Sequence, residues 1–150
     1  MKRFLQVLVT VMALIGCIGS AFAADKKDEA KALVKKAVSF MKQNGNEKAL
    51  SEFNNPKGQF VKGDLYIFVL DSKVTMLANG GNQKLVGKNL ANLKDAQGKL
   101  FNKDLMETAQ HGGGWAPEYK WSNPLTKKIE PKLAYVEPVG DLLVGCGFYK

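Results

Sequence analysis

The sequence predicts an α+β domain in which a long N-terminal helix packs on an antiparallel sheet of about five strands with a helical insert. Two patterns predict this class. An apolar stripe with helical spacing runs through the first part of the chain, and short apolar runs bounded by turn residues follow it. Because only a few residues connect the last strands, these strands are expected to pair as antiparallel neighbours.

The N-terminal helix is expected over residues 25–43. Its apolar residues recur at intervals of three and four, and they are Ala30, Leu33, Val34, Ala37, Val38 and Met41. Lysines fill the opposite face, and Asn44-Gly45 supplies a helix stop because glycine tolerates the left-handed conformation. A second short helix is expected over residues 47–53.

Five later segments are apolar and rich in β-branched and aromatic residues, which is typical of strands. They are residues 63–71, 73–78, 115–121, 132–139 and 142–149. Between the second and third of these segments, residues 102–110 are expected to form a helix capped by Asn102. The sequence therefore predicts a hairpin, a helical insert and a three-strand meander.

The N-terminus has the features of a secretory signal peptide. Lys2 and Arg3 precede an apolar run over residues 4–18, and Ala21-Phe22-Ala23 fits a cleavage site. We therefore expect residues 1–23 to be removed and residues 24–150 to form one exported domain in the periplasm or outside the cell.

A competing interpretation concerns Cys17. The tetrapeptide Leu14-Ile15-Gly16-Cys17 has the form of a lipoprotein box, in which Cys17 would carry the lipid anchor. Cleavage after Ala23 would instead leave Cys146 as the single thiol, so no internal disulfide is expected.

The charge of the domain comes from lysine alone. Of the 22 basic residues, Lys2 and Arg3 lie in the predicted signal peptide, which leaves 20 lysines against 14 acidic residues, a net charge of +6. Nucleic-acid readers rely on the planar fork of arginine, so this composition argues against nucleic acid as a partner. Any buried anion has to be bound by lysine, hydroxyl or backbone N–H groups.

The stretch HGGGWAPEYKWSNP, residues 111–124, carries the only histidine, but the chain lacks the partners that catalysis needs. His111 precedes a Gly-rich turn like that of esterases, yet there is no G-x-S-x-G nucleophile elbow. The chain has no clustered histidines, cysteines or acidic residues with metal-ligand spacing, and no haem attachment motif. We therefore expect no enzyme activity, no metal and no cofactor.

Residues 58–149 resemble the single Cache sensor domains of bacteria. The motifs that carry the resemblance are Gly63-Asp64-Leu65-Tyr66, Leu85-Val86-Gly87-Lys88, residues 95–98, Gly114-Trp115, Asn123-Pro124, Pro131-Lys132 and Gly147-Phe148-Tyr149. The resemblance implies a PAS-like sheet, with the long helix on one side and a small-ligand pocket closed by the middle segment. It also implies sensing of small organic molecules, often short carboxylates, for chemoreceptors or kinases.

Two departures from the family pattern lie near the implied pocket. Asn79-Gly80 stands where family members usually carry a histidine-proline pair. Trp115 and Tyr119 are four residues apart, where the family spacing is three, and Pro117 lies between them. Proline cannot donate to a ladder, so a bulge or an edge position is expected there.

Five residues are the candidates for ligand binding. In an ideal strand Trp115, Tyr119 and Trp121 share one face, where they are either core or pocket residues. The resemblance favours the pocket for Trp115 and Tyr119, and it adds Tyr66, Lys132 and Tyr135, with the Lys132 ammonium pairing a carboxylate. Lys132 and Tyr135 differ by three positions, so a regular strand places them on opposite faces.

We expect a free-standing Cache domain that binds a small organic ligand and signals through a separate membrane-bound partner. The alternative is a structural or interaction module without a ligand, which dimerises or docks through its N-terminal helix. A homodimer through that helix is compatible with either function.

Overall fold

The computed structural model describes residues 18–150, with side chains from Asp25 onward. The predicted apolar run of the signal peptide and Cys17 lie outside this part of the chain. Three α-helices and seven strands are formed: α1 Ile18–Asn44, α2 Asn46–Phe53, α3 Phe101–Gln110, β1 Val61–Lys62, β2 Leu65–Leu70, β3 Met76–Asn79, β4 Gly114–Trp115, β5 Tyr119–Ser122, β6 Ile129–Val139 and β7 Leu142–Tyr149. Within residues 18–150, no helix is both long and apolar enough to span a membrane.

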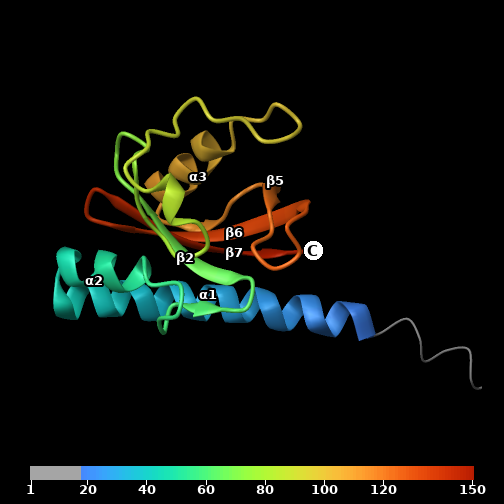
Figure 1. The fold of residues 1–150 in the computed structure, drawn as a ribbon, viewed down its shortest axis with the longest axis horizontal. Helices are drawn as coiled ribbons and strands as arrows, with labels where there is room; N and C mark the ends of the chain where they lie inside the picture. The colour runs from blue at the N-terminus through green and yellow to red at the C-terminus, as the bar shows by residue number, and fades with distance from the viewer. Residues whose placement is uncertain (1–17) are drawn as a thin grey trace, which may run out of the picture.

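The strands form one antiparallel sheet with β7 at its centre. β7 pairs with β2 on one side and with β6 on the other, while β1 and β3 extend the sheet beyond β2. Both β4 and β5 pair with β6 at the opposite edge. Helices α1 and α2 cover one face of this sheet, and α3 with the segment before it covers the other (Figure 1). The α+β architecture predicted from the sequence is confirmed.

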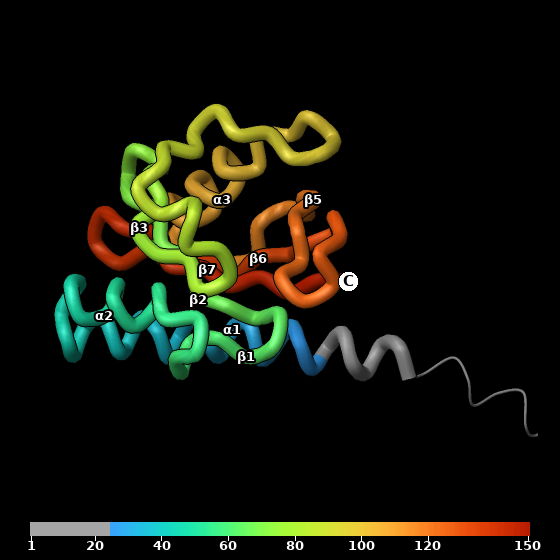
Figure 2. Tube along the Cα trace, in the orientation of Figure 1, coloured from blue at the N-terminus to red at the C-terminus, as the bar shows by residue number. Residues whose placement is uncertain are grey.

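Helix α1 uses its apolar stripe to form the first core. Ala30, Val34, Ala37 and Met41 are almost completely buried between the helix and the sheet, together with side chains from β2 and β7. In Figure 2 the helix crosses the whole width of the sheet, so this stripe is already occupied within the chain. Cys146 lies in the same core, where burial raises the pKa of its thiol to about 12.

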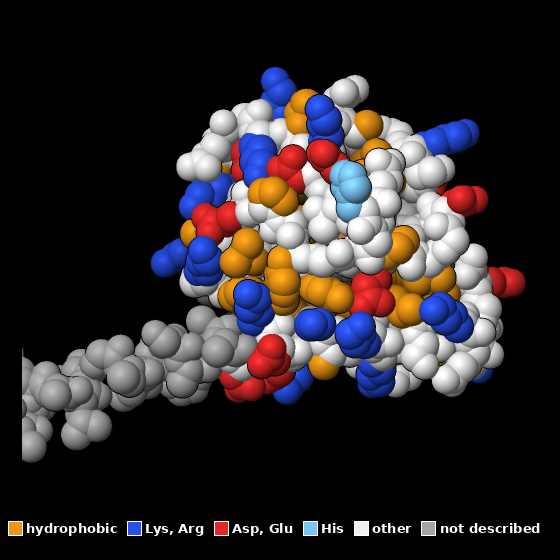
Figure 3. Space-filling model, turned by 180° about the vertical axis from the view of Figure 1, so that it is seen from behind, with side chains coloured by type: hydrophobic (Ala, Val, Ile, Leu, Met, Phe, Trp, Pro, Cys, Tyr) orange, Lys and Arg blue, Asp and Glu red, His pale blue; other side chains and the backbone are white. Residues whose placement is uncertain are grey.

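Three lysines on α1 fasten the helix to the outer edge of the sheet. Lys35 forms an ion pair with Glu137 of β6 at 2.8 Å. The ammonium groups of Lys27 and Lys31 lie over the rings of Trp115 and Tyr135, at 5.2 and 5.5 Å from the ring centroids. In Figure 3 a row of basic side chains lies below a band of hydrophobic side chains, and further basic side chains lie above it.

The segment expected as one strand over residues 115–121 is in fact two short strands. β4 pairs Trp115 with Tyr135, whereas β5 pairs Tyr119 with Lys132, so the register against β6 shifts by one residue between them. The shift coincides with Pro117, as the bulge expected there requires. A one-residue shift reverses the faces of the side chains, so the prediction of a common face for Trp115 and Tyr119 was wrong.

The second core lies between the other face of the sheet and α3. It contains Phe68 and Leu70 of β2, Leu105 and Ala109 of α3, and Leu90 from the segment that leads to α3. The expected cap at Asn102 was wrong, because α3 begins at Phe101. The Asn102 amide instead donates to the Leu90 carbonyl at 3.0 Å and holds the segment to the helix.

Asp95 ties the loop before α3 to β5. Its carboxylate accepts the backbone N–H groups of Gln97, Lys99 and Lys120, each at 2.9 Å. These bonds hold the pKa of the Asp95 carboxyl below its usual value, and the bond from the Lys120 N–H has the largest effect. Because the folded pKa is the lower one, Asp95 stabilises the fold above the unfolded pKa, and this contribution is lost as pH falls through the folded pKa.

We therefore predict that Asp95→Asn lowers the free energy of unfolding at neutral pH. The parent should lose more stability than the variant on acidification from about pH 5 to about pH 2. Urea unfolding at a series of pH values measures both effects, with Asp141→Asn, at an exposed turn, as the control. Parallel pH curves for parent and Asp95→Asn would contradict the assignment.

Candidate functional site

A small cavity lies between the second face of the sheet and α3. Its lining comes from β2, β3, β5, β6, α3 and the segment before α3, and consists of Tyr66, Phe68, Met76, Asn79, Leu90, Phe101, Asn102, Leu105, Tyr119, Trp121 and Lys132. The space measures about 20 Å³, enough for about one water molecule. It is the place where buried polar groups from distant parts of the sequence meet.

Lys132 is the most unusual group of this cavity. Its side chain is 1% exposed, and its ammonium donates to the Tyr66 hydroxyl at 2.7 Å. The ammonium also lies 4.1 and 4.9 Å from the ring centroids of Tyr66 and Tyr149. All five ion pairs among residues 25–150 involve other lysines. Among the side chains of residues 25–150, Lys132 is thus a buried cation with one hydrogen-bond partner, a hydroxyl, and no carboxylate within ion-pair distance.

Two glycines make room for this pair. On the neighbouring strand β7, Gly147 faces the Lys132 stem, and a methyl group at Gly147 would overlap the Lys132 Cε atom. Gly81 lies against the Tyr66 ring, where a Cβ would approach to 2.7 Å. A side chain at either position would therefore displace the lysine or the tyrosine.

Tyr119 supplies a second polar group from the strand beside Lys132. The two residues are cross-strand partners, and the Tyr119 ring stacks on Phe101 at 4.5 Å. Burial raises the pKa of the Tyr119 phenol well above its usual value, so the hydroxyl stays protonated and can donate. The Tyr66 hydroxyl is bonded to Lys132, whereas no hydrogen bond of the Tyr119 hydroxyl is found among the side chains of residues 25–150.

The remaining walls are mostly apolar. Phe68, Met76, Leu90, Leu105 and Trp121 surround the polar groups. Asn79, which stands where the family usually has histidine, accepts the backbone N–H groups of Gly81 and Asn82 and shapes the turn after β3. The lining therefore combines a few polar groups with apolar walls, the chemistry of a site for a small ligand with one polar end.

The other two predicted residues, Trp115 and Tyr135, lie on the opposite face of the sheet. The centroids of their rings are 5.4 Å apart, and both rings pack against the core under α1. The Tyr135 hydroxyl donates to Glu137 at 3.0 Å. The structure thus brings Tyr66, Tyr119 and Lys132 together and does not bring Trp115 and Tyr135 to them. Trp115 lies on the other face because the register shifts by one residue near Pro117. Tyr135 lies there because it is three positions, an odd number, from Lys132 on the same strand.

Sequence reasoning missed several lining residues. Phe68 lies two positions after Tyr66 on β2, so strand alternation could have identified it. Leu90, Phe101 and Asn102 carry no local signal, because the middle segment folds back over the sheet only through tertiary contacts. Among residues 25–150 no cluster of histidine, cysteine or acidic side chains could hold a metal ion. His111 caps the far end of α3 on the surface and does not line the cavity.

The sequence profile of the family described as Single Cache domain 2 matches residues 3–150, nearly the whole chain. The chain belongs to this family. Single Cache domains are sensor modules, and the resemblance seen in the sequence motifs is confirmed.

Solved structures share the fold of this Cache domain. A methyl-accepting chemotaxis protein from Vibrio parahaemolyticus superposes with a TM-score of 0.72 at 25% identity, covering 87% of this chain and 92% of that one. A structure described as the basis for carboxylic acid recognition by a Cache chemosensory domain has a TM-score of 0.67 at 20% identity, covering 87% and 97%.

One curated relative is the sensor histidine kinase MctS of Rhizobium johnstonii, 33% identical over 88 residues, which are 57% of this chain. The chain spans about a fifth of the length of that relative, 19%. The similarity therefore concerns a sensor-sized part of a larger signalling protein.

We predict that Lys132→Met stabilises the unliganded Cache domain. Methionine keeps the length of the stem and removes a buried charge that has no counter-charge, a change worth about 1–4 kcal/mol when buried ionic groups are replaced by apolar ones. Chemical denaturation measures the free energy of unfolding. A destabilised Lys132→Met variant would show that the lysine is mainly structural, through its contacts with the two tyrosines.

Proposed function

We propose that this Cache domain binds a short organic carboxylate in the cavity around Lys132. The observation that carries the proposal is the buried Lys132 ammonium, which has a hydroxyl as its partner and no acidic side chain in any ion pair with it among residues 25–150. Burying an unpaired ammonium is unfavourable, and a bound anion would supply the missing charge. Pairing with a ligand anion would relieve this unfavourable burial of Lys132, and the relief would add to the free energy of ligand binding.

The neighbouring groups fit an anionic ligand. An ammonium has three donors, and Lys132 uses one of them on Tyr66, so two remain for a ligand. The protonated Tyr119 hydroxyl adds a further donor from the adjacent strand. Charge-assisted hydrogen bonds of this kind are about twice as strong as neutral ones.

The size of the cavity limits the ligand and implies movement. A space of about 20 Å³ is filled by about one water molecule, so even the smallest carboxylate needs more room. The wall formed by Leu90, Phe101 and Asn102 belongs to the middle segment and α3, and it covers the sheet from one side. We propose that this wall moves outward on binding. This movement would be the conformational change that the domain transmits to its signalling partner.

We further propose that the domain works outside the cytoplasm, after removal of residues 1–23, and reports to a separate membrane-bound partner. The signal-peptide pattern of the sequence supports the location. The chemotaxis protein and the histidine kinase to which the chain is similar support a signalling partner of the same kind. Lipidation of Cys17 would give an anchored form, and the mass of the mature protein distinguishes the two.

Homodimerisation through α1 remains a prediction, and the structure limits the part of α1 that a second copy could contact. The apolar stripe of α1 packs on the sheet of its own chain, so only the polar outer face of the helix is free for a second copy. Sedimentation of the purified protein with and without ligand tests this association.

Short carboxylates should stabilise the protein against heat. A screen with acetate, propionate, lactate and pyruvate should give at least one upward shift of Tm, and a ligand at 100 times its Kd adds about 2.7 kcal/mol. The matching neutral amides should give no shift, because they cannot compensate the Lys132 charge, and Lys132→Met should abolish the response. No shift with any carboxylate, or equal shifts with the amides, would refute the ligand class.

Tyrosine variants on the two faces of the sheet should differ in ligand affinity. Tyr119→Phe removes a cavity hydroxyl and should weaken carboxylate binding about tenfold, the value of one hydrogen bond to a charged group. Tyr135→Phe removes a hydroxyl that donates to Glu137 on the other face, and should leave the affinity unchanged. Calorimetric titration measures both, and equal losses would argue against this cavity as the binding site.

A further inference from the structure

We propose that the turn between β5 and β6 docks on the surface of a membrane that contains anionic lipids. The docking group, here called the β5–β6 tip, consists of Leu125, Lys127, Lys128 and Ile129. It lies at the end of the sheet near the start of α1, next to the C-terminal residue (Figure 1). The tip shares no residue with the cavity, so this inference stands independently of the proposed ligand.

Two large apolar side chains of the tip project into solvent. Leu125 is 63% exposed and Ile129 58% exposed, against 38% for Val86 and 39% for Leu100, the other exposed large hydrophobic residues among those described. A single exposed leucine is ordinary on a protein surface. Two of them at one turn, on either side of two lysines, combine apolar area with positive charge, the two contributions from which binding at an anionic membrane surface gains.

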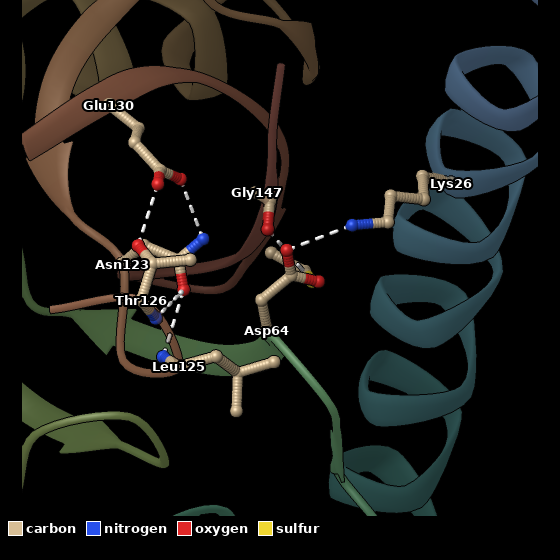
Figure 4. Close-up of polar contacts among 8 residues, drawn as sticks. Lys26, Asp64, Asn123, Leu125, Thr126, Glu130 and Gly147 are labelled. Carbon is tan, nitrogen blue, oxygen red and sulfur yellow. Dashed lines mark hydrogen bonds and ion pairs between the residues drawn. The ribbon is translucent and has the colours of Figure 1, made fainter. Parts of the chain in front are cut away.

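The turn is held rigidly in this conformation. The Asn123 side-chain oxygen accepts the backbone N–H groups of Leu125 and Thr126, at 2.9 and 3.4 Å (Figure 4). The backbone of Asn123 adds two hydrogen bonds, with Lys127 and Lys128, each at 2.9 Å. Lys127 adopts a left-handed conformation, with φ 61°. The exposed side chains are therefore preorganised and need no rearrangement to reach a surface.

The turn has a net positive charge because its two lysines, Lys127 and Lys128, outnumber its one carboxylate, Glu130. Glu130 accepts hydrogen bonds from the Thr126 hydroxyl at 2.6 Å and the Asn123 amide at 2.7 Å, and these bonds lower the pKa of its carboxyl (Figure 4). Lys127 and Lys128 are exposed, and neither takes part in an ion pair among residues 25–150. Their ammonium groups are available to phosphate groups of anionic lipids.

The tip lies near the N-terminal part of α1. The Leu125 side chain lies beside Gly63, and the next residue, Asp64, forms an ion pair with Lys26 of α1 at 2.9 Å. Lys26 follows the start of α1 at Ile18 by about 12 Å along the helix axis. In the alternative form that carries a lipid on Cys17, the anchor would precede this end of α1 and bring the tip near the membrane, whereas the form cleaved after Ala23 would bind through the tip alone.

The small area of the tip favours lipid over a protein partner. A stable protein interface buries about 1,200 Å² or more, which two apolar side chains and two lysines cannot supply. Interfacial membrane binding, in contrast, needs only a few inserted apolar groups together with basic residues that meet anionic headgroups.

Vesicle binding of the protein, purified as the cell exports it, tests the proposal. The parent should co-sediment with phosphatidylcholine vesicles that contain phosphatidylglycerol, and much less with phosphatidylcholine alone. Lys127→Gln with Lys128→Gln should weaken the binding about 25-fold, since each lysine near an anionic surface contributes a factor of about five. Leu125→Ser with Ile129→Ser should weaken it about tenfold or more.

Matched variants and an insertion probe complete the test. Lys48→Gln with Lys57→Gln, two exposed lysines far from the tip, and Val86→Ser, an exposed apolar residue elsewhere, should bind as the parent does. Leu125→Trp should add a fluorescence signal that shifts to shorter wavelength on the anionic vesicles, after subtraction of the parent signal. Equal binding by the tip variants and their controls would overturn the proposal. So would a change in oligomeric state caused by the tip variants, since that would identify a protein interface.

Discussion

The hydrogen bond between the Lys132 ammonium and the Tyr66 hydroxyl imposes the strictest requirement on this fold. A cation that is almost completely buried needs every neighbour to be compatible with it. Gly147 provides the space for its stem, and aromatic rings face the charge from two sides. The sheet keeps β6 beside both β5 and β7, so that Tyr119 and Tyr149 flank the lysine. The arrangement is electrostatically incomplete, and this incompleteness is the basis of the anionic ligand that we propose for the cavity.

The sequence predicted the polar centre of the site better than its walls. Tyr66, Tyr119 and Lys132 were identified from motifs, and all three line one cavity. Trp115 was placed with them on the family resemblance, together with the two-residue repeat of an ideal strand. The one-residue shift near Pro117 reverses that assignment, and only the pairing partners on β6 reveal where the shift falls. A bulge was foreseen from the proline, but its effect on the facing of Trp115 needed the register.

The rest of the site depends on how the middle segment folds over the sheet. Asn102 looked like a helix cap, since asparagine before an apolar pattern usually is one. In the structure it is the second residue of α3 and bonds Leu90, because the segment needs an anchor at that point. Such contacts, between a helix and a segment of irregular conformation, produce no periodic pattern in the sequence. The two shorter helices and the long strands, in contrast, followed their apolar spacing to within a few residues, whereas α1 begins at Ile18, seven residues before its predicted start.

The small size of the cavity would also have a kinetic consequence for the proposed ligand. Because the space holds about one water molecule, a carboxylate could enter or leave only when the wall around Leu90 and Asn102 moves outward. The frequency of these openings then sets the association rate, which falls below that of an open site. Release is slowed by the same barrier, so occupancy averages the external concentration over the lifetime of the closed state. A sensor built in this way filters out fluctuations that are faster than its own opening.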